Sequence, residues 1–100
     1  MNQKAIMQLQ NRLEKIQQEL AETVVEGSAG GGVVAVQVTA TREFRGIKID
    51  PSAVDPADVE MLEDLITAAI QDAMAKAVST TEAKMSVLTG GLKIPGMGLM

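Results

Sequence analysis

Residues 33–50, VVAVQVTATREFRGIKID, hold two segments rich in β-branched residues with a polar turn between them. In the first segment, Val34, Val36 and Val38 alternate with smaller or polar residues, which predicts a strand with one well-buried face. Residues 39–42 are the predicted turn, although they lack the Asn-Gly pair typical of two-residue hairpins. Together the two segments predict an antiparallel hairpin.

The second segment, residues 43–50, alternates unevenly. Phe44 has the opposite parity from Ile47 and Ile49, so in a regular strand its side chain would face away from theirs. Either Phe44 packs on the other face of the sheet, or Gly46 marks a β-bulge that shifts the register. Residues 23–27 are a third candidate strand, which would make the sheet three-stranded and antiparallel.

A long helix is predicted before the hairpin, over residues 4–24. Its apolar residues recur at steps of three and four, as one helical face requires, at Ile6, Leu9, Leu13, Ile16 and Leu20. At about 1.5 Å per residue this helix spans roughly 30 Å, more than a short sheet needs for cover. Part of it is therefore expected to project as an arm. The glycine-rich residues 26–32 then break the helix.

A second long helix is predicted after Asp50 and Pro51 end the sheet. Asp55 is its expected N-cap and Pro56 its first residue. Its apolar stripe is made of Val59, Leu62, Ile66, Ile70, Ala73 and Ala77, widened by Met61, Leu65 and Ala69. Three poor helix formers at residues 79–81 predict a weak point or break before the helix resumes.

These elements predict an α+β fold with a long N-terminal helix, a three-stranded antiparallel sheet and a long C-terminal helix. Residues 1–91 are expected to form one domain, and residues 92–100 a flexible or partner-docked tail rich in Gly and Met. A chain of 100 residues buries a small core, and the wide second stripe exceeds the needs of one sheet. Both features predict a homodimer, with a candidate interface at Val34, Val36, Val38, Leu62 and Ile66.

The composition argues against an enzyme. The chain has no His and no Cys, which excludes the commonest general base, thiol nucleophiles and nearly all zinc sites. The acidic residues Glu60, Glu63 and Asp64 are better interpreted as a solvated helix face than as a cation site. No catalytic residue, metal, cofactor or small-molecule substrate is predicted.

The same composition bears on location. A cysteine-free chain fits a reducing compartment, and the polar start has no apolar signal-peptide core. Its apolar runs are far shorter than the roughly 18 residues of a membrane span. We expect a cytoplasmic protein without membrane insertion.

Charge is distributed unevenly although the total is −4. Residues 1–49 carry six basic and five acidic side chains, whereas residues 50–100 carry three basic and eight acidic ones. Any surface that binds an anion must therefore use the first half. The candidate contacts to phosphates of double-stranded DNA are Lys4, Gln8, Arg12 and Lys15 on the first helix, with Arg42 and Arg45 at the hairpin. Taken singly, each of the basic residues is better interpreted as an ordinary surface charge than as a DNA contact.

Four segments in this order resemble the YbaB/EbfC family of bacterial nucleoid-associated proteins. They are VEGSAGGGV (residues 25–33), IKIDP (47–51), DPADVEMLEDL (55–65) and LTGGLKIPGM (88–97). The resemblance implies a homodimer whose projecting helices hold duplex DNA with little sequence preference, which influences nucleoid organisation and gene expression. The chain departs from the family at Thr39 and Ala40, where relatives often carry Asn-Gly, and in a first helix with fewer Lys and more Gln.

A rival hypothesis is a dimeric protein-interaction module without direct DNA binding. The net charge of −4, the wide apolar stripe and the nearly uncharged tail all favour it.

Overall fold

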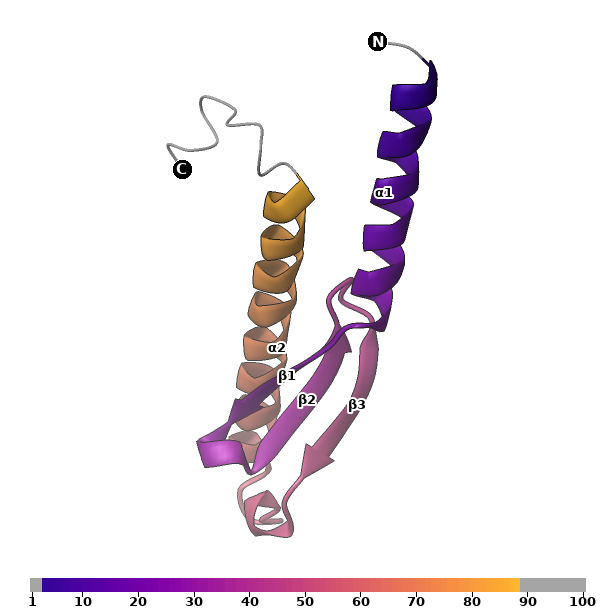
Figure 1. Ribbon diagram of the computed structural model, residues 1–100. Helices are drawn as coiled ribbons and strands as arrows, with labels where there is room; N and C mark the ends of the chain where they lie inside the picture. The colour runs from indigo at the N-terminus through magenta and orange to yellow at the C-terminus, as the bar shows by residue number, and fades with distance from the viewer. Residues whose placement is uncertain (1–2, 89–100) are drawn as a thin grey trace, which may run out of the picture.

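The computed structural model describes residues 3–88, which form an α+β fold (Figure 1). The elements in chain order are α1 (Gln3–Glu22), β1 (Val24–Ala29), β2 (Val34–Thr39), β3 (Phe44–Ile49) and α2 (Val59–Leu88). The predicted fold class is therefore confirmed. The predicted tail at residues 92–100 lies outside the described residues.

The three strands form one antiparallel sheet in the order β1-β2-β3. A short 3₁₀ turn, Gly30–Gly32, links β1 to β2, and its three glycines have φ of 65, 73 and 97°. Glycine adopts this left-handed region at little steric cost, so the glycines form a tight turn as predicted. They do not break the helix, however, because α1 has already ended at Glu22. The preceding residues of the glycine-rich segment, up to Ala29, belong to β1 instead.

The uneven second segment forms β3 with a bulge. Val36 lies opposite Ile47, but one step further along β2 the partner of Val38 is Phe44, so β3 contains one extra residue, Arg45. Of the two predicted alternatives, the bulge beside Gly46 is the correct one. Because directly opposed residues of antiparallel strands share a face, Phe44, Ile47 and Ile49 lie on the same side of the sheet as the three valines of β2.

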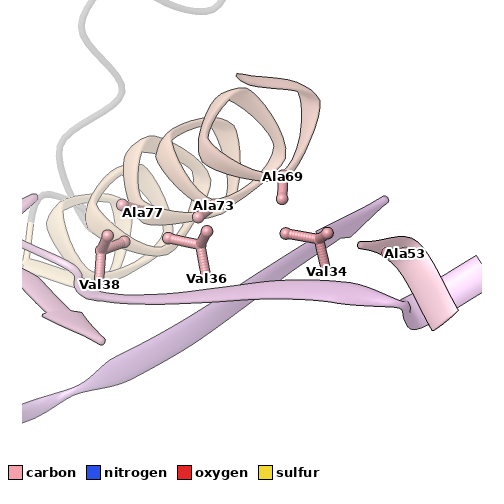
Figure 2. Close-up of a cluster of buried hydrophobic side chains, with 7 residues drawn as sticks. All are labelled: Val34, Val36, Val38, Ala53, Ala69, Ala73 and Ala77. Carbon is pink, nitrogen blue, oxygen red and sulfur yellow. The ribbon is translucent and has the colours of Figure 1, made fainter. Parts of the chain in front are cut away.

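The core lies between the sheet and α2. Val34, Val36 and Val38 are fully buried and point at Ala69, Ala73 and Ala77 of the helix (Figure 2). The small alanines let the helix approach the strands closely. At Gly27 of β1 the helix backbone leaves no room for a side chain, because an added Cβ would lie 2.1 Å from the Ala73 nitrogen.

Helix α2 packs on β1 and β2 and leaves β3 uncovered. The apolar side chains of β3 therefore stay exposed, and Phe44 keeps 55% of its surface accessible. This uncovered apolar face, made of Phe44, Ile47 and Ile49, is called the β3 face below.

The start of α2 corrects the prediction. Asp55 opens a β-turn instead of capping the helix, since its backbone oxygen accepts from the Asp58 N–H at 2.9 Å. The cap is Asp58, whose carboxylate accepts from the Met61 N–H at 3.2 Å. Pro56 occupies the second position of the turn, where its restricted φ is equally suitable.

The break predicted at residues 79–81 does not occur, because α2 is continuous from Val59 to Leu88. Thr81 uses its hydroxyl to donate to the Ala40 backbone oxygen at 2.9 Å, in the turn between β2 and β3. Tertiary contact thus overrides weak local helix propensity.

Candidate nucleic-acid interface

Helix α1 is built from good helix formers, with no Gly or Pro between Gln3 and Glu22. Thr23 ends it, because its backbone N–H donates to the Leu20 oxygen at 3.2 Å and its hydroxyl donates to the Glu19 oxygen at 2.6 Å. The chain then turns directly into β1.

Only the base of α1 is packed. Leu20 is 2% exposed, Leu13 and Ile16 are half-buried, and Leu9 and Ile6 are 47% and 42% exposed. The helix runs away from the end of the sheet (Figure 1), and the molecule is correspondingly elongated, at 65 × 28 × 16 Å. Residues 3–15 of α1, whose side chains are exposed except for the half-buried Leu13, are called the arm below.

Four of the predicted DNA contacts lie together on the arm. Lys4, Gln8 and Arg12 follow each other at steps of four and Lys15 comes three residues later, so they share one helical face, and all four are exposed. They span about 16 Å along the helix axis. Within residues 3–13 the arm carries no acidic side chain, since the three glutamates of α1 begin at residue 14.

The two hairpin arginines lie elsewhere, near the base of α1. Arg42 is exposed in the turn between β2 and β3 and has φ of 70°, which is unfavourable for a residue with a Cβ. Arg45, the extra residue of the bulge, places Nη2 3.5 Å from the Ala21 oxygen in the last turn of α1. Ala21 lies about 25 Å along the helix from Lys4, so the six candidates do not form one cluster.

Acidic groups gather toward the opposite end of the molecule. Glu60, Glu63 and Asp64 are exposed near the start of α2, which lies far from the tip of α1 (Figure 1). Negative charge at a helix N-terminus is favourable. The protomer is therefore electrically polarised, with its acid-free cationic segment at the tip of the arm.

Hydrogen bonds within the fold lower the pKa of two carboxyl groups, Asp72 and Asp50. The Ser28 N–H and Lys76 both contact Asp72, and these two contacts lower the pKa of that carboxyl. The pKa of Asp50 is lowered by the hydrogen bond from the Ser52 N–H, which begins the 3₁₀ turn Pro51–Ala53. Both groups stabilise loops or edges of the fold and lie away from the arm.

The candidate dimer residues divide into two groups. Val34, Val36 and Val38 fill the core of the protomer and have no accessible surface. Leu62 and Ile66 are half-buried against that core. The β3 face was missed as a candidate surface because its common side depends on the bulge at Arg45, which alternation alone leaves ambiguous.

Sequence reasoning also missed the contacts that hold the base of α1. Lys84 of α2 places its Nζ 3.4 Å from the Glu19 carboxylate, and Thr81 reaches the hairpin turn. Thr81 also lines a groove of about 390 Å³, together with Leu20, Ala40 and Val78. These residues are distant in sequence, so no local pattern links them.

Neither helix within residues 3–88 combines the length and the apolar character that crossing a membrane requires. Across the same residues, no group of three or more acidic side chains is placed to hold a metal ion.

Comparison with known proteins gives a consistent result. The family model described as the YbaB/EbfC DNA-binding family matches residues 1–92. A nucleoid-associated protein of Chloroflexus aurantiacus is 50% identical over 97 residues, covering 93% of this chain and 97% of the relative. One of Dictyoglomus turgidum is 48% identical over 92 residues, covering 92% of this chain and 88% of the relative.

A solved structure shares the fold. The crystal structure of an uncharacterized protein from Helicobacter pylori matches with a TM-score of 0.71 at 18% identity, over 93% of this chain and 99% of that one. Because the family model covers nearly the whole chain and the relatives are about half identical, the chain belongs to the YbaB/EbfC DNA-binding family.

Proposed function

We propose that this protein binds double-stranded DNA as a homodimer, through the cationic face of its two arms, with little sequence preference. The observation that carries the proposal is the exposed face of Lys4, Gln8, Arg12 and Lys15 on an arm segment almost free of acidic groups. Such side chains contact phosphates, which position a protein on a duplex without reading bases. Arg42 and Arg45 would add charge at the base of the arm.

The names of the relatives support a place in the cell as well. We propose that the protein acts in the cytoplasm at the nucleoid, with which its relatives are associated by name, and that it influences DNA organisation and gene expression there. We further propose that it is not an enzyme, since it lacks His and Cys and belongs to a DNA-binding family.

The proposed dimer would cover the β3 face. The outer edge of β1 is already closed by α2, since Asp72 accepts from the Ser28 N–H at 3.0 Å and Lys76 donates to the Glu26 oxygen at 3.0 Å. On the other side, Phe44, Ile47 and Ile49 form an apolar surface beside the helix. A second copy that covers this surface, together with the exposed parts of Leu62 and Ile66, would complete the core.

Light scattering tests the dimer. The wild-type protein should have a mass of about twice 10.5 kDa. Ile47→Asp should yield a folded monomer, because it places a charge on the β3 face. Lys48→Asp is the matched control on the opposite face of the same strand, and it should remain dimeric. A wild-type monomer at micromolar concentration would contradict the proposal.

DNA binding is tested by titrating a duplex at several salt concentrations. If three to five phosphates are neutralised, raising the salt from about 50 to about 200 mM should weaken binding by roughly forty- to five-hundred-fold. Replacing both Arg12 and Lys15 by Gln should lower the affinity for every duplex and flatten the salt slope by up to about four units if both arms bind. Lys76→Gln removes a charge from α2 and serves as the control that should keep the slope.

A protein-interaction module without direct DNA binding is the second candidate. The exposed apolar residues Ile6 and Leu9 on the arm favour it, since a helix can dock through such a stripe. No binding of any duplex at about 20 mM salt would favour this alternative, because phosphate contacts are strongest there.

A further inference from the structure

The base of α1 is held by a small set of polar contacts that meet at one residue of the hairpin turn. Ala40 is 2% exposed, and its N–H donates to the Thr23 oxygen, directly after α1, at 2.8 Å. The Ala40 oxygen accepts from the Thr81 hydroxyl of α2 at 2.9 Å. One peptide segment of the turn therefore ties the end of α1 to the C-terminal third of α2.

A second link joins the two helices directly. Lys84 lies three residues beyond Thr81, on the same side of α2, and its Nζ is 3.4 Å from the Glu19 carboxylate. Glu19 is one turn before Thr23, so both links act on the last turn of α1. The set Glu19, Thr23, Ala40, Thr81 and Lys84 is called the brace.

Besides the brace, the buried Leu20 and the contact of Arg45 Nη2 with the Ala21 oxygen at 3.5 Å hold the base of α1. Toward the N-terminus, the apolar stripe of α1 is half-buried at Ile16 and Leu13 and exposed at Leu9 and Ile6. The arm is also a long lever. A change of about 10° at its base would displace a tip that lies roughly 30 Å away by about 5 Å, more than a hydrogen bond to a phosphate tolerates.

We propose that Thr81 and Lys84 are positioning residues for DNA binding, which act by holding α1 at a defined angle to α2. The proposal rests on the proposed function of the arms. Neither residue needs to contact DNA, because the brace limits the orientations that the cationic face samples before it meets the duplex. Binding loses less conformational entropy when a surface is organised beforehand.

This role also explains a conflict in the sequence. Residues 79–81 are poor helix formers inside the C-terminal third of a thirty-residue helix. A valine or alanine at position 81 would serve the helix equally well or better but would leave the buried Ala40 oxygen without its donor. The threonine is therefore needed for its hydroxyl.

The experiment measures arm direction and DNA affinity separately. The chain has no cysteine, so Asn11→Cys on α1 and Ala75→Cys on α2, both at exposed positions, can be spin-labelled specifically. Dilution with unlabelled protein restricts the measured distances to single chains. Thr81→Val removes the hydroxyl, Thr81→Ser keeps it, and the pair Glu19→Lys with Lys84→Glu reverses the ion pair at constant net charge.

We expect Thr81→Val to broaden the distance distribution and weaken duplex binding by roughly five-fold, and Thr81→Ser to preserve both properties. Lys84→Glu alone should broaden the distribution, and the reversed pair should restore it together with the affinity. Melting curves and light scattering identify any variant that fails to fold or to dimerise, and the serine variant and the reversed pair then carry the test.

An unchanged distance distribution in Thr81→Val and Lys84→Glu would overturn the brace. A broadened distribution with unaltered DNA affinity would overturn its role in binding. If the wild-type protein binds no duplex at low salt, the proposed function fails and the positioning role fails with it, whereas the distances still decide whether the brace holds the arm.

Discussion

Both helices of this protein carry an apolar stripe, but the stripe of α2 packs on the sheet whereas most of the stripe of α1 stays exposed. Helix α2 presses alanines onto the valines of β2, and Gly27 of β1 allows the backbones to come close. Helix α1 presents larger side chains, Ile6 and Leu9 among them, yet leaves them exposed along the arm. Small residues at the contact let α2 approach this sheet closely, whereas the larger apolar side chains of the arm have no sheet surface to pack on.

Gly27→Ala should disrupt the packing of α2 on the sheet, and it should lower the stability of the protein more than the other substitutions do. The new Cβ would meet backbone atoms of Ala69 and Ala73, which cannot move aside without displacing α2. We expect a loss of about 3 kcal/mol or more in the free energy of unfolding. Gly46→Ala is the control, because its Cβ would meet no atom within 4 Å. Urea denaturation measures the free energy of unfolding of both variants. A small loss of stability in Gly27→Ala would contradict the close contact between β1 and α2.

Leucine truncation compares the base of α1 with its arm. Leu20→Ala should cost about 2 to 4 kcal/mol because the side chain is buried, whereas Leu9→Ala should cost less than about 1 kcal/mol. Thermal unfolding of both variants at matched concentration gives the difference. Equal losses would mean that another protein surface covers the arm in solution.

Arg42→Gly should stabilise the hairpin at the base of the arm. Its φ of 70° suits glycine better than arginine, so the free energy of unfolding should rise by about 1 kcal/mol. Arg42→Ala removes the same charge but retains the Cβ, and it should give no such gain. If both variants were equally stabilised, charge rather than backbone strain would be the cause.

The smallest effect concerns pH and the closed edge of β1. The Ser28 N–H and Lys76 favour the ionised form of Asp72, which places its pKa in the folded protein below the ordinary 3.8. The resulting stabilisation is present above pH 3.8 and is lost as the pH falls through the lowered value. Asp72→Asn should therefore be less stable than wild type at neutral pH, with the difference closing in acid.

Urea denaturation at several pH values between about 2 and 7 tests this expectation. Asp64→Asn, at an exposed position of the same helix, controls for the loss of one negative charge. A constant difference between Asp72→Asn and wild type across that range would show that the carboxylate contributes through packing.

Much of the fold could be predicted because its signals are local. The 3–4 spacing of α1 and the alternation of Val34, Val36 and Val38 each depend on residues within one element. The N-cap of α2 was placed wrongly at Asp55, because a turn and a helix start use the same Asp-Pro signal. The face of Phe44 depends on one extra residue, Arg45, and alternation counts cannot locate a bulge by themselves.

The candidate site was predictable only in part. The spacing of Lys4, Gln8, Arg12 and Lys15 places them on one helical face, and the structure leaves that face open. The brace could not be foreseen, since Thr81 and Ala40 are 41 residues apart and Lys84 and Glu19 are 65 apart. Such pairs are joined by chain topology, and the local signal at residues 79–81 pointed to a break instead.

The sequence by itself determined the order of elements, the valine face of the sheet, the cationic face of α1 and the absence of His and Cys chemistry. Only the tertiary structure decided which apolar faces are covered, leaving the arm and the β3 face bare while α2 is buried. The physical reason is that periodicity follows from the geometry of a few neighbouring residues. Close packing instead depends on the volumes that distant residues bring together, as Gly27 and Ala73 do here.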